Sequence, residues 1–273
     1  MSAVVAAPGP VVAASPPRIF GFVVSRLDAE AIAERIATTL RQPAGAGHAG
    51  PDDGRGVGLV VTPNIDHVRL LRHDADFAAA YASAAIITCD GFPVFRYARL
   101  RGCAPAGRVT GVDLARALLR HPALGRHRVF FAADSDATAD GLRRWAARRG
   151  MDGQVATHVP PHGFERDPAA SGALVDAIAA HGTTLLLMGV GAPRSEAFVH
   201  GHRARLPPCW ALCVGQALRI EAGVIRRAPS VLAASGTEWL WRLAHEPRRL
   251  SSRYAAGSVG FLRAIAADLR KQG

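Results

Sequence analysis

The sequence has few cysteines and aromatic residues, and it has no long apolar run. Aromatic side chains make up 6% of the 273 residues, and the cysteines are Cys89, Cys103, Cys209 and Cys213. Their irregular spacing does not fit a zinc site, so we expect reduced, buried thiols of a cytosolic protein. No run of about 18 apolar residues occurs, so we expect no membrane-spanning helix. Residues 1–17 lack the basic start and unbroken apolar run of a signal peptide, and we expect a disordered tail there.

Lysine is almost absent from the chain. Lys271 is the only one, so arginine carries nearly all of the formal net charge of +11. This excess of positive charge implies an anionic partner. The phosphates of a sugar nucleotide, an acidic membrane and a nucleic acid all qualify. Because no recognised nucleic-acid-binding motif accompanies the charge, we expect no nucleic acid as a partner.

Short apolar strands alternate with helical patterns along most of the chain. This order predicts a mainly parallel sheet with helices on both faces. The wholly apolar stretch Leu185–Met188 fits a strand that is buried on both sides. We therefore predict an α/β fold over residues 18–229, two-lobed and Rossmann-like with mainly parallel sheets. The predicted strands are Arg18–Ser25, Val57–Val61, Ile86–Cys89, Arg128–Ala133, Gln154–Val159, Thr184–Met188 and Trp210–Val214.

Three of these strands end in turns that suit ligand binding: Thr62-Pro63-Asn64, Cys89-Asp90-Gly91 and Gly189-Val190-Gly191-Ala192-Pro193. In an open α/β sheet the ligand crevice lies at the carboxyl ends of the strands, so the three turns are expected to converge. Asp90 is placed to act as a general base, although the same position suits a cap of the next helix. Thr62 and Asn64 have side chains that bind a sugar hydroxyl or a phosphate, or that form only a turn and a helix cap.

Two further motifs each allow a functional and a structural interpretation. The glycine turn from Gly189 to Glu196 opens a helix and offers backbone N–H groups to phosphate, although it matches neither a Rossmann fingerprint nor a Walker loop. Asp134-Ser135-Asp136 is similar to the Asp-x-Asp that holds a divalent metal against a nucleotide diphosphate in many enzymes, but it also suits a helix N-cap. His158 and His162 are four residues apart, and the prolines between them exclude a helical pair of metal ligands.

The alternation of strands and helices stops at Ser230. Residues 230–273 have a helical pattern that is broken at Pro247, and they carry seven basic and three acidic residues. Trp239 and Trp241 lie among the arginines, which is typical of an amphipathic segment on an anionic membrane surface. The alternative is a helical pair that packs on the sheet with solvated arginines.

Seven stretches, taken together and in order, resemble the WecG/TagA/CpsF family of bacterial glycosyltransferases (family 26). They are TPNIDH (Thr62 to His67), CDGFPV (Cys89 to Val94), RVTGVDL (Arg108 to Leu114), HGF (His162 to Phe164), GVGAPRSE (Gly189 to Glu196), AGVIRRAP (Ala222 to Pro229) and EWLWRLAHEPRRLSSRY (Glu238 to Tyr254). The resemblance implies transfer of a hexose or N-acetylhexosamine, such as N-acetylmannosamine, from a UDP-sugar to a polyprenyl-diphosphate-linked saccharide. It implies an inverting enzyme of cell-surface polysaccharide biosynthesis that needs no metal or other cofactor. Such an enzyme works peripherally on the cytoplasmic face of the plasma membrane.

The resemblance also implies roles for individual residues. Asp90 matches the family's proposed base, with Thr62 and Asn64 beside it. Three arginines of the C-terminal region, the proposed membrane- and acceptor-docking appendage, match contacts to the acceptor diphosphate: Arg242, Arg249 and Arg253. Further substrate- or nucleotide-binding residues are expected at Gly91, Arg108, Thr110, Gly111, Asp113, Gly189, Gly191, Pro193, Ser195, Glu196 and Gly215.

Three departures from the family pattern lie where donor recognition is expected. Ser195 stands where the family has Gln, Gln216 where it has Gly, and Arg219 where it has Asp. The identity of the donor sugar is therefore open. The alternative to an active enzyme is a catalytically weakened member that binds nucleotide or lipid diphosphate as a scaffold. The resemblance also leaves a homo-oligomer open.

Overall fold

The computed structural model describes residues 16–43, 54–229, 232 and 247–270. Neighbouring strands in this part of the chain all pair in parallel, in the order β2-β1-β6-β5-β3-β4. The predicted α/β fold is thereby confirmed, with a single sheet where the sequence suggested two lobes and more than one sheet. The strands are β1 (Gly58–Val61), β2 (Ile86–Ile87), β3 (Val129–Ala132), β4 (Val155–His158), β5 (Leu185–Met188) and β6 (Trp210–Cys213).

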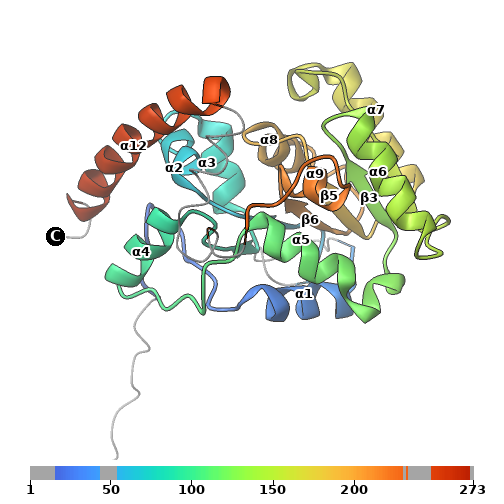
Figure 1. Ribbon diagram of the computed structural model, residues 1–273, viewed down its shortest axis with the longest axis horizontal. Coiled ribbons are helices and arrows are strands. Elements are labelled where there is room, and N and C mark those ends of the chain that lie inside the picture. Colours follow the sequence, from blue (N-terminus) through green and yellow to red (C-terminus); the bar gives the residue numbers. More distant parts are fainter. Residues whose placement is uncertain (1–15, 44–53, 230–231, 233–246, 271–273) are drawn as a thin grey trace, which may run out of the picture.

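Helices cover both faces of the sheet (Figure 1). One face carries α1 (Ala29–Thr38), α5 (Gly111–Arg120), α6 (Asp136–Ala147) and α9 (Ala217–Glu221). The other carries α2 (Ile65–Leu70), α3 (Ala75–Ala82), α4 (Phe92–Leu100), α7 (Pro168–Ala180), α8 (Arg194–Gly201) and the C-terminal α12 (Pro247–Arg270). Two short 3-10 helices, η1 (Pro122–Arg126) and η2 (Phe164–Arg166), lie in the connections.

Successive residues of β5 point to opposite faces of the sheet. Leu185 and Leu187 pack with residues of α1, α5 and α6, while Leu186 and Met188 pack with residues of α3, α7 and α8. Because neither face meets water, every position of the strand has to be apolar. This explains why the strand was recognisable from its sequence alone.

The first predicted strand, Arg18–Ser25, is not a strand. Ile19 and Phe22 instead close a tight turn, in which each backbone N–H donates to the other residue's carbonyl at 3.0 Å. Phe20 and Gly21 have positive φ angles of 51° and 89°, a conformation that cannot continue a strand. Ile19 and Phe22 are apolar because they are buried against the helices on one face, not because they pair in the sheet.

The C-terminal helix α12 begins at Pro247, where the sequence predicts a break, and packs along α2. A methyl group at Gly257 would lie 3.0 Å from a side-chain oxygen of Asp66, so the two helices approach closely. Phe261 belongs to the buried cluster on this face of the sheet. The second half of α12, whose side chains are described, is therefore part of the packed structure. This agrees with the alternative of a packed helical segment, although the helix packs against α2 where that alternative expected the sheet.

All four cysteines are buried and free, as predicted. Burial raises the pKa of the Cys89 and Cys209 thiols to about 12, so both are protonated at neutral pH. No helix within the described ranges is both long enough and apolar enough to cross a bilayer.

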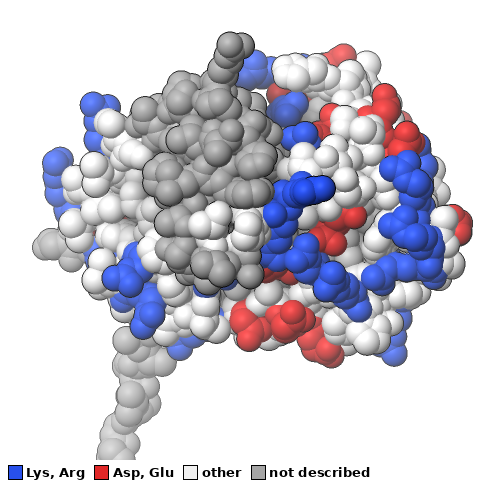
Figure 2. Space-filling view, in the orientation of Figure 1, with Lys and Arg blue, Asp and Glu red and all other residues white. Residues whose placement is uncertain are grey.

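Arginine side chains gather on the face of the molecule shown in Figure 2. They lie over the region of α5, α6 and α9, with small groups of acidic side chains between them. This distribution agrees with the excess of positive charge in the sequence.

Candidate active site

The first turn of α5 lies where three strand ends meet. The segment before it runs beside the end of β2, since the N–H of Val109 donates to the carbonyl of Cys89 at 3.0 Å. A methyl group at Gly111 would lie 3.0 Å from the carbonyl oxygen of Val214, after β6, and 3.4 Å from the hydroxyl oxygen of Thr62, after β1. Glycine therefore allows the start of α5 to approach both strand ends closely. The predicted convergence of strand ends takes place around this helix N-terminus.

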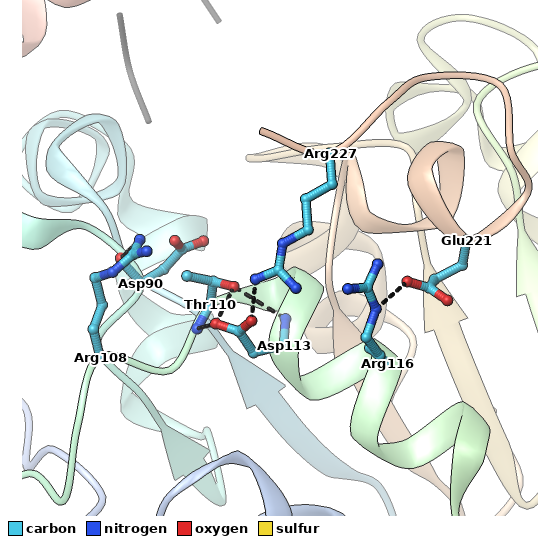
Figure 3. A network of polar contacts seen from close by, with 7 residues as sticks. All are labelled: Asp90, Arg108, Thr110, Asp113, Arg116, Glu221 and Arg227. Atoms are coloured by element: carbon cyan, nitrogen blue, oxygen red, sulfur yellow. Dashed lines mark hydrogen bonds and ion pairs between the residues drawn. The ribbon is translucent and has the colours of Figure 1, made fainter. Parts of the chain in front are cut away.

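Asp90 stands half-buried at the end of β2, beside the same helix N-terminus. Its backbone N–H and that of Gly91 both donate to the carbonyl of Pro63, at 3.1 and 3.2 Å, and Arg108 Nη1 donates to the carbonyl of Asp90 at 3.1 Å. The N-cap residue of α4 is Gly91, the residue after Asp90. The capping interpretation of Asp90 is therefore wrong. Figure 3 shows its carboxylate on the side of Thr110 and the first turn of α5.

Thr62 and Asn64, in the turn after β1, have structural partners. Thr62 is buried, and its hydroxyl donates to the carbonyl of Cys213 at 3.4 Å. The side chain of Asn64 caps α2 by accepting from the N–H groups of Asp66 and His67, at 3.0 and 3.3 Å. The turn-and-cap interpretation of this motif is confirmed, and the binding roles of the two residues stay predictions.

A network of polar side chains surrounds the first turn of α5 (Figure 3). Thr110 and Asp113 form a capping box, in which the Thr110 hydroxyl donates to Asp113 Oδ2 at 2.7 Å and accepts from the Asp113 N–H at 3.0 Å. Arg227, from the segment after α9, forms an ion pair with Asp113 Oδ1. One turn further along, Arg116 Nε lies 3.1 Å from Glu221 Oε1.

Two left-handed glycine turns lie side by side at the ends of β5 and β6. Gly191 and Gly215 have φ angles of 84° and 49°, which favour glycine. A methyl group at Gly215 would lie 4.0 Å from Gly191 Cα. Gly189 is buried, and Pro193 is the N-cap residue of α8, without a side-chain cap. Through Val214, which adjoins both Gly111 and Gly215, the third predicted turn joins the other two.

Ser195 and Glu196 lie in the first turn of α8 and face the interior. Each is 1% exposed. The Ser195 hydroxyl donates to the carbonyl of Gly191 at 3.3 Å, and Glu196 Oε2 has no hydrogen-bond partner among the described residues. Burial raises the pKa of the Glu196 carboxyl to about 7. The Ser195 hydroxyl thus ties α8 to the glycine turn, and both side chains are enclosed by the protein rather than exposed at its surface.

Asp134-Ser135-Asp136 follows β3 and has structural partners as well. Ser135 is the N-cap residue of α6, and the Thr138 hydroxyl donates to Asp134 Oδ1 at 2.7 Å. The helix-cap interpretation is therefore confirmed. Arg219 Nε lies 3.5 Å from Asp134 Oδ2, so the arginine that departs from the family pattern pairs with this motif. Groups of three or more potential metal ligands do not occur among the described residues.

The sequence analysis chose three arginines for the acceptor and missed a fourth near the site. Arg242 lies outside the described residues, and Arg249 and Arg253 lie in the part of α12 whose side chains are not described. Arg227 was missed, although the quoted stretch AGVIRRAP contains it. No local pattern signals its ion pair, because Asp113 lies 114 positions earlier in the chain.

The chain is similar to known glycosyl transferases over nearly its whole length. The family model of the Glycosyl transferase WecG/TagA/CpsF family matches residues 17–273. An N-acetylglucosaminyldiphosphoundecaprenol N-acetyl-beta-D-mannosaminyltransferase of Bacillus spizizenii is 28% identical over 200 residues, which cover 72% of this chain and 75% of the relative. The resemblance seen in the sequence is thereby confirmed, and the activity is that of a hexosyltransferase. The chain belongs to the WecG/TagA/CpsF family of glycosyl transferases.

Proposed function

We propose that this enzyme moves a hexose or N-acetylhexosamine, with N-acetylmannosamine as the first candidate, from a UDP-sugar to a polyprenyl-diphosphate-linked saccharide. The observation that carries the proposal is the meeting of Asp90, the N-terminus of α5 and the paired glycine turns at one edge of the sheet. Such an edge offers backbone N–H groups and positive helix ends to a diphosphate. The acceptor is supported by the name of the relative from Bacillus spizizenii, which specifies an N-acetylglucosaminyl-diphosphoundecaprenol. An acceptor of this kind belongs to cell-surface polysaccharide biosynthesis.

Asp90 is the proposed general base of a single displacement. Its carboxylate takes the proton of the acceptor hydroxyl while that oxygen forms a bond to the anomeric carbon of the donor. The bond between the anomeric carbon and the nucleotide diphosphate breaks, and its electron pair leaves on the diphosphate oxygen. Because the acceptor attacks opposite the leaving group, the configuration of the anomeric carbon is inverted.

Arginines and helix N-termini are proposed to offset the charge of the leaving diphosphate, in place of a metal ion. Arg108 is anchored beside Asp90 through the Asp90 carbonyl, and arginine forms paired hydrogen bonds with phosphate oxygens. The positive end of α5 lies at the same place. The Asp134 carboxylate, the first of the Asp-x-Asp pattern, is engaged by Thr138 and Arg219.

The outer face of α12 supports docking on a membrane surface. Val259, Leu262, Ala266 and Leu269 are exposed and recur at a spacing of three or four residues, which places them on one side of the helix. Arg263 and Arg270 are exposed beside this stripe, while Phe261 and Ala264 are buried on the opposite side. An apolar stripe with neighbouring arginines suits the interface of an anionic bilayer, where a lipid-linked acceptor is found.

A transfer assay tests the proposed function. A panel of UDP-sugars is offered with a synthetic polyprenyl-diphosphate saccharide, with and without EDTA. We expect product of inverted configuration from one hexose or N-acetylhexosamine donor, at the same rate in EDTA. A loss of activity in EDTA that Mn²⁺ or Mg²⁺ restores would contradict the metal-free mechanism. If no donor is used while UDP still binds, the scaffold alternative replaces the transfer proposal.

A further inference from the structure

Arg227 shares its carboxylate partner with the cap of α5. Its Nη2 donates to Asp113 Oδ1, while Asp113 Oδ2 accepts from the Thr110 hydroxyl at 2.7 Å. The Asp113 carboxylate therefore serves both Arg227 and the cap of α5, one oxygen for each. The pair sits on the turn of α5 that adjoins the ends of β1, β2 and β6.

A second ion pair joins α5 to α9, the helix that precedes the segment of Arg227. Arg116 lies one turn further along α5, and its Nε is 3.1 Å from Glu221 Oε1 in α9. This pair connects α5 to α9. The Arg227 pair connects α5 to the segment after α9, at the turn of α5 that adjoins the strand ends.

The guanidinium of Arg227 has more hydrogen-bond donors than its ion pair uses. It carries five N–H groups in one plane. One N–H group donates to Asp113, and the others have no partner among the described residues. The side chain is 25% exposed, so a solute can reach it. In Figure 3 the guanidinium lies over the first turn of α5, on the side that also carries Asp90 and Arg108.

We infer that Arg227 binds an oxygen of the substrate diphosphate, and that Asp113 is the positioning residue that holds it there. This inference rests on the proposed function, because a diphosphate occurs in both the UDP-sugar and the lipid-linked acceptor. Arg108 and Arg227 approach the N-terminus of α5 from two sides, so an oxyanion at that point meets two guanidinium groups and the positive end of a helix.

Calorimetric titration of the full-length protein tests this role. UDP, UMP and farnesyl diphosphate are the probes, and the variants are Arg227→Gln, Arg227→Lys and the matched control Arg116→Gln. We expect Arg227→Gln to weaken binding of a diphosphate by about tenfold or more, with a smaller effect on UMP, because a charged donor to the terminal phosphate is lost. Arg227→Lys restores part of the affinity, since it keeps the charge but loses the planar pair of donors. Arg116→Gln leaves binding unchanged.

Thermal unfolding of the same variants separates binding from stability. Arg227→Gln and Arg116→Gln each remove one partly exposed ion pair of α5, so their melting temperatures should fall to a similar, small extent. Unchanged affinity of Arg227→Gln for both diphosphates would overturn the inference and leave the proposed function intact. A wild-type protein that binds farnesyl diphosphate but not UDP would contradict the UDP donor, while a loss of that binding in Arg227→Gln would still support the inference. A wild-type protein that binds neither diphosphate would overturn both.

Discussion

The carboxyl group of Glu196 is buried away from water. Its Oε2 atom has no hydrogen-bond partner among the described residues. Burial raises its pKa from 4.5 to about 7. The native state therefore holds a proton on Glu196 at pH values between these two, where the unfolded chain has released it. Because the unfolded state then binds fewer protons than the native state, the free energy of unfolding falls as the pH rises through this window.

Replacing Glu196 with Gln removes this titration. Relative to wild type, the variant should gain stability as the pH rises from 4 to about 7, whatever constant cost the buried amide adds. The pKa difference corresponds to a gain on the order of 3 kcal/mol, which is reached above pH 7. Thermal unfolding of both proteins across this range measures it, with Glu30→Gln on the exposed side of α1 as the control. If the difference in unfolding free energy between the variant and wild type stays constant with pH, burial does not raise the pKa of Glu196.

At the scale of single residues, local sequence predicted the caps and the position of Asp90 after a strand. Asn64 and Ser135 were recognisable as possible caps because each stands directly before a helical pattern. Asp90 was recognisable because it ends an apolar strand and precedes a glycine. The inward direction of Glu196 was not predictable, since it depends on how α8 packs against α3 and the sheet. The position of Arg227 depends on the return of the chain to α5 after α9.

At the scale of elements, the periodicity of the sequence predicted seven strands, and six of them are present in the structure. Leu185–Met188 and its neighbours are apolar at every position because helices cover both sides of the sheet. Arg18–Ser25 is also rich in apolar residues, but Ile19 and Phe22 are buried by helices around a turn. An apolar composition indicates that a segment is buried, but it does not indicate whether the backbone of the segment pairs with another strand.

The two sides of α12 lead to a prediction about membrane binding. Leu262 is 67% exposed on the outer stripe, so Leu262→Glu should leave the melting temperature nearly unchanged and weaken sedimentation with phosphatidylglycerol vesicles several-fold. Leu40→Glu is the matched control, because Leu40 is also half-exposed but follows α1 on the opposite face of the sheet. The control should sediment like wild type. Equal vesicle binding by the Leu262 variant and wild type would remove the stripe from the membrane contact.

At the scale of the whole molecule, one parallel sheet brings distant parts of the chain to a single edge. The turns after β1 and β2, the glycine turns after β5 and β6 and the start of α5 all lie there. The sequence predicted this convergence, because the carboxyl ends of parallel strands share one edge. It could not show that the N-terminus of α5 occupies the middle, since that depends on the close approach of Gly111 to Thr62 and Val214.

The central claim is that Asp90 is the base of sugar transfer at this edge. The most direct measurement is turnover of Asp90→Asn, with the donor and lipid acceptor that wild type uses, beside Asp176→Asn as a control with an exposed carboxylate on α7. We expect Asp90→Asn to lower turnover by about two to four orders of magnitude, because a positioned base is lost, while UDP affinity and melting temperature change little. The Asp176 variant should retain full turnover. Near-normal turnover of the Asp90 variant on that acceptor would contradict the mechanism.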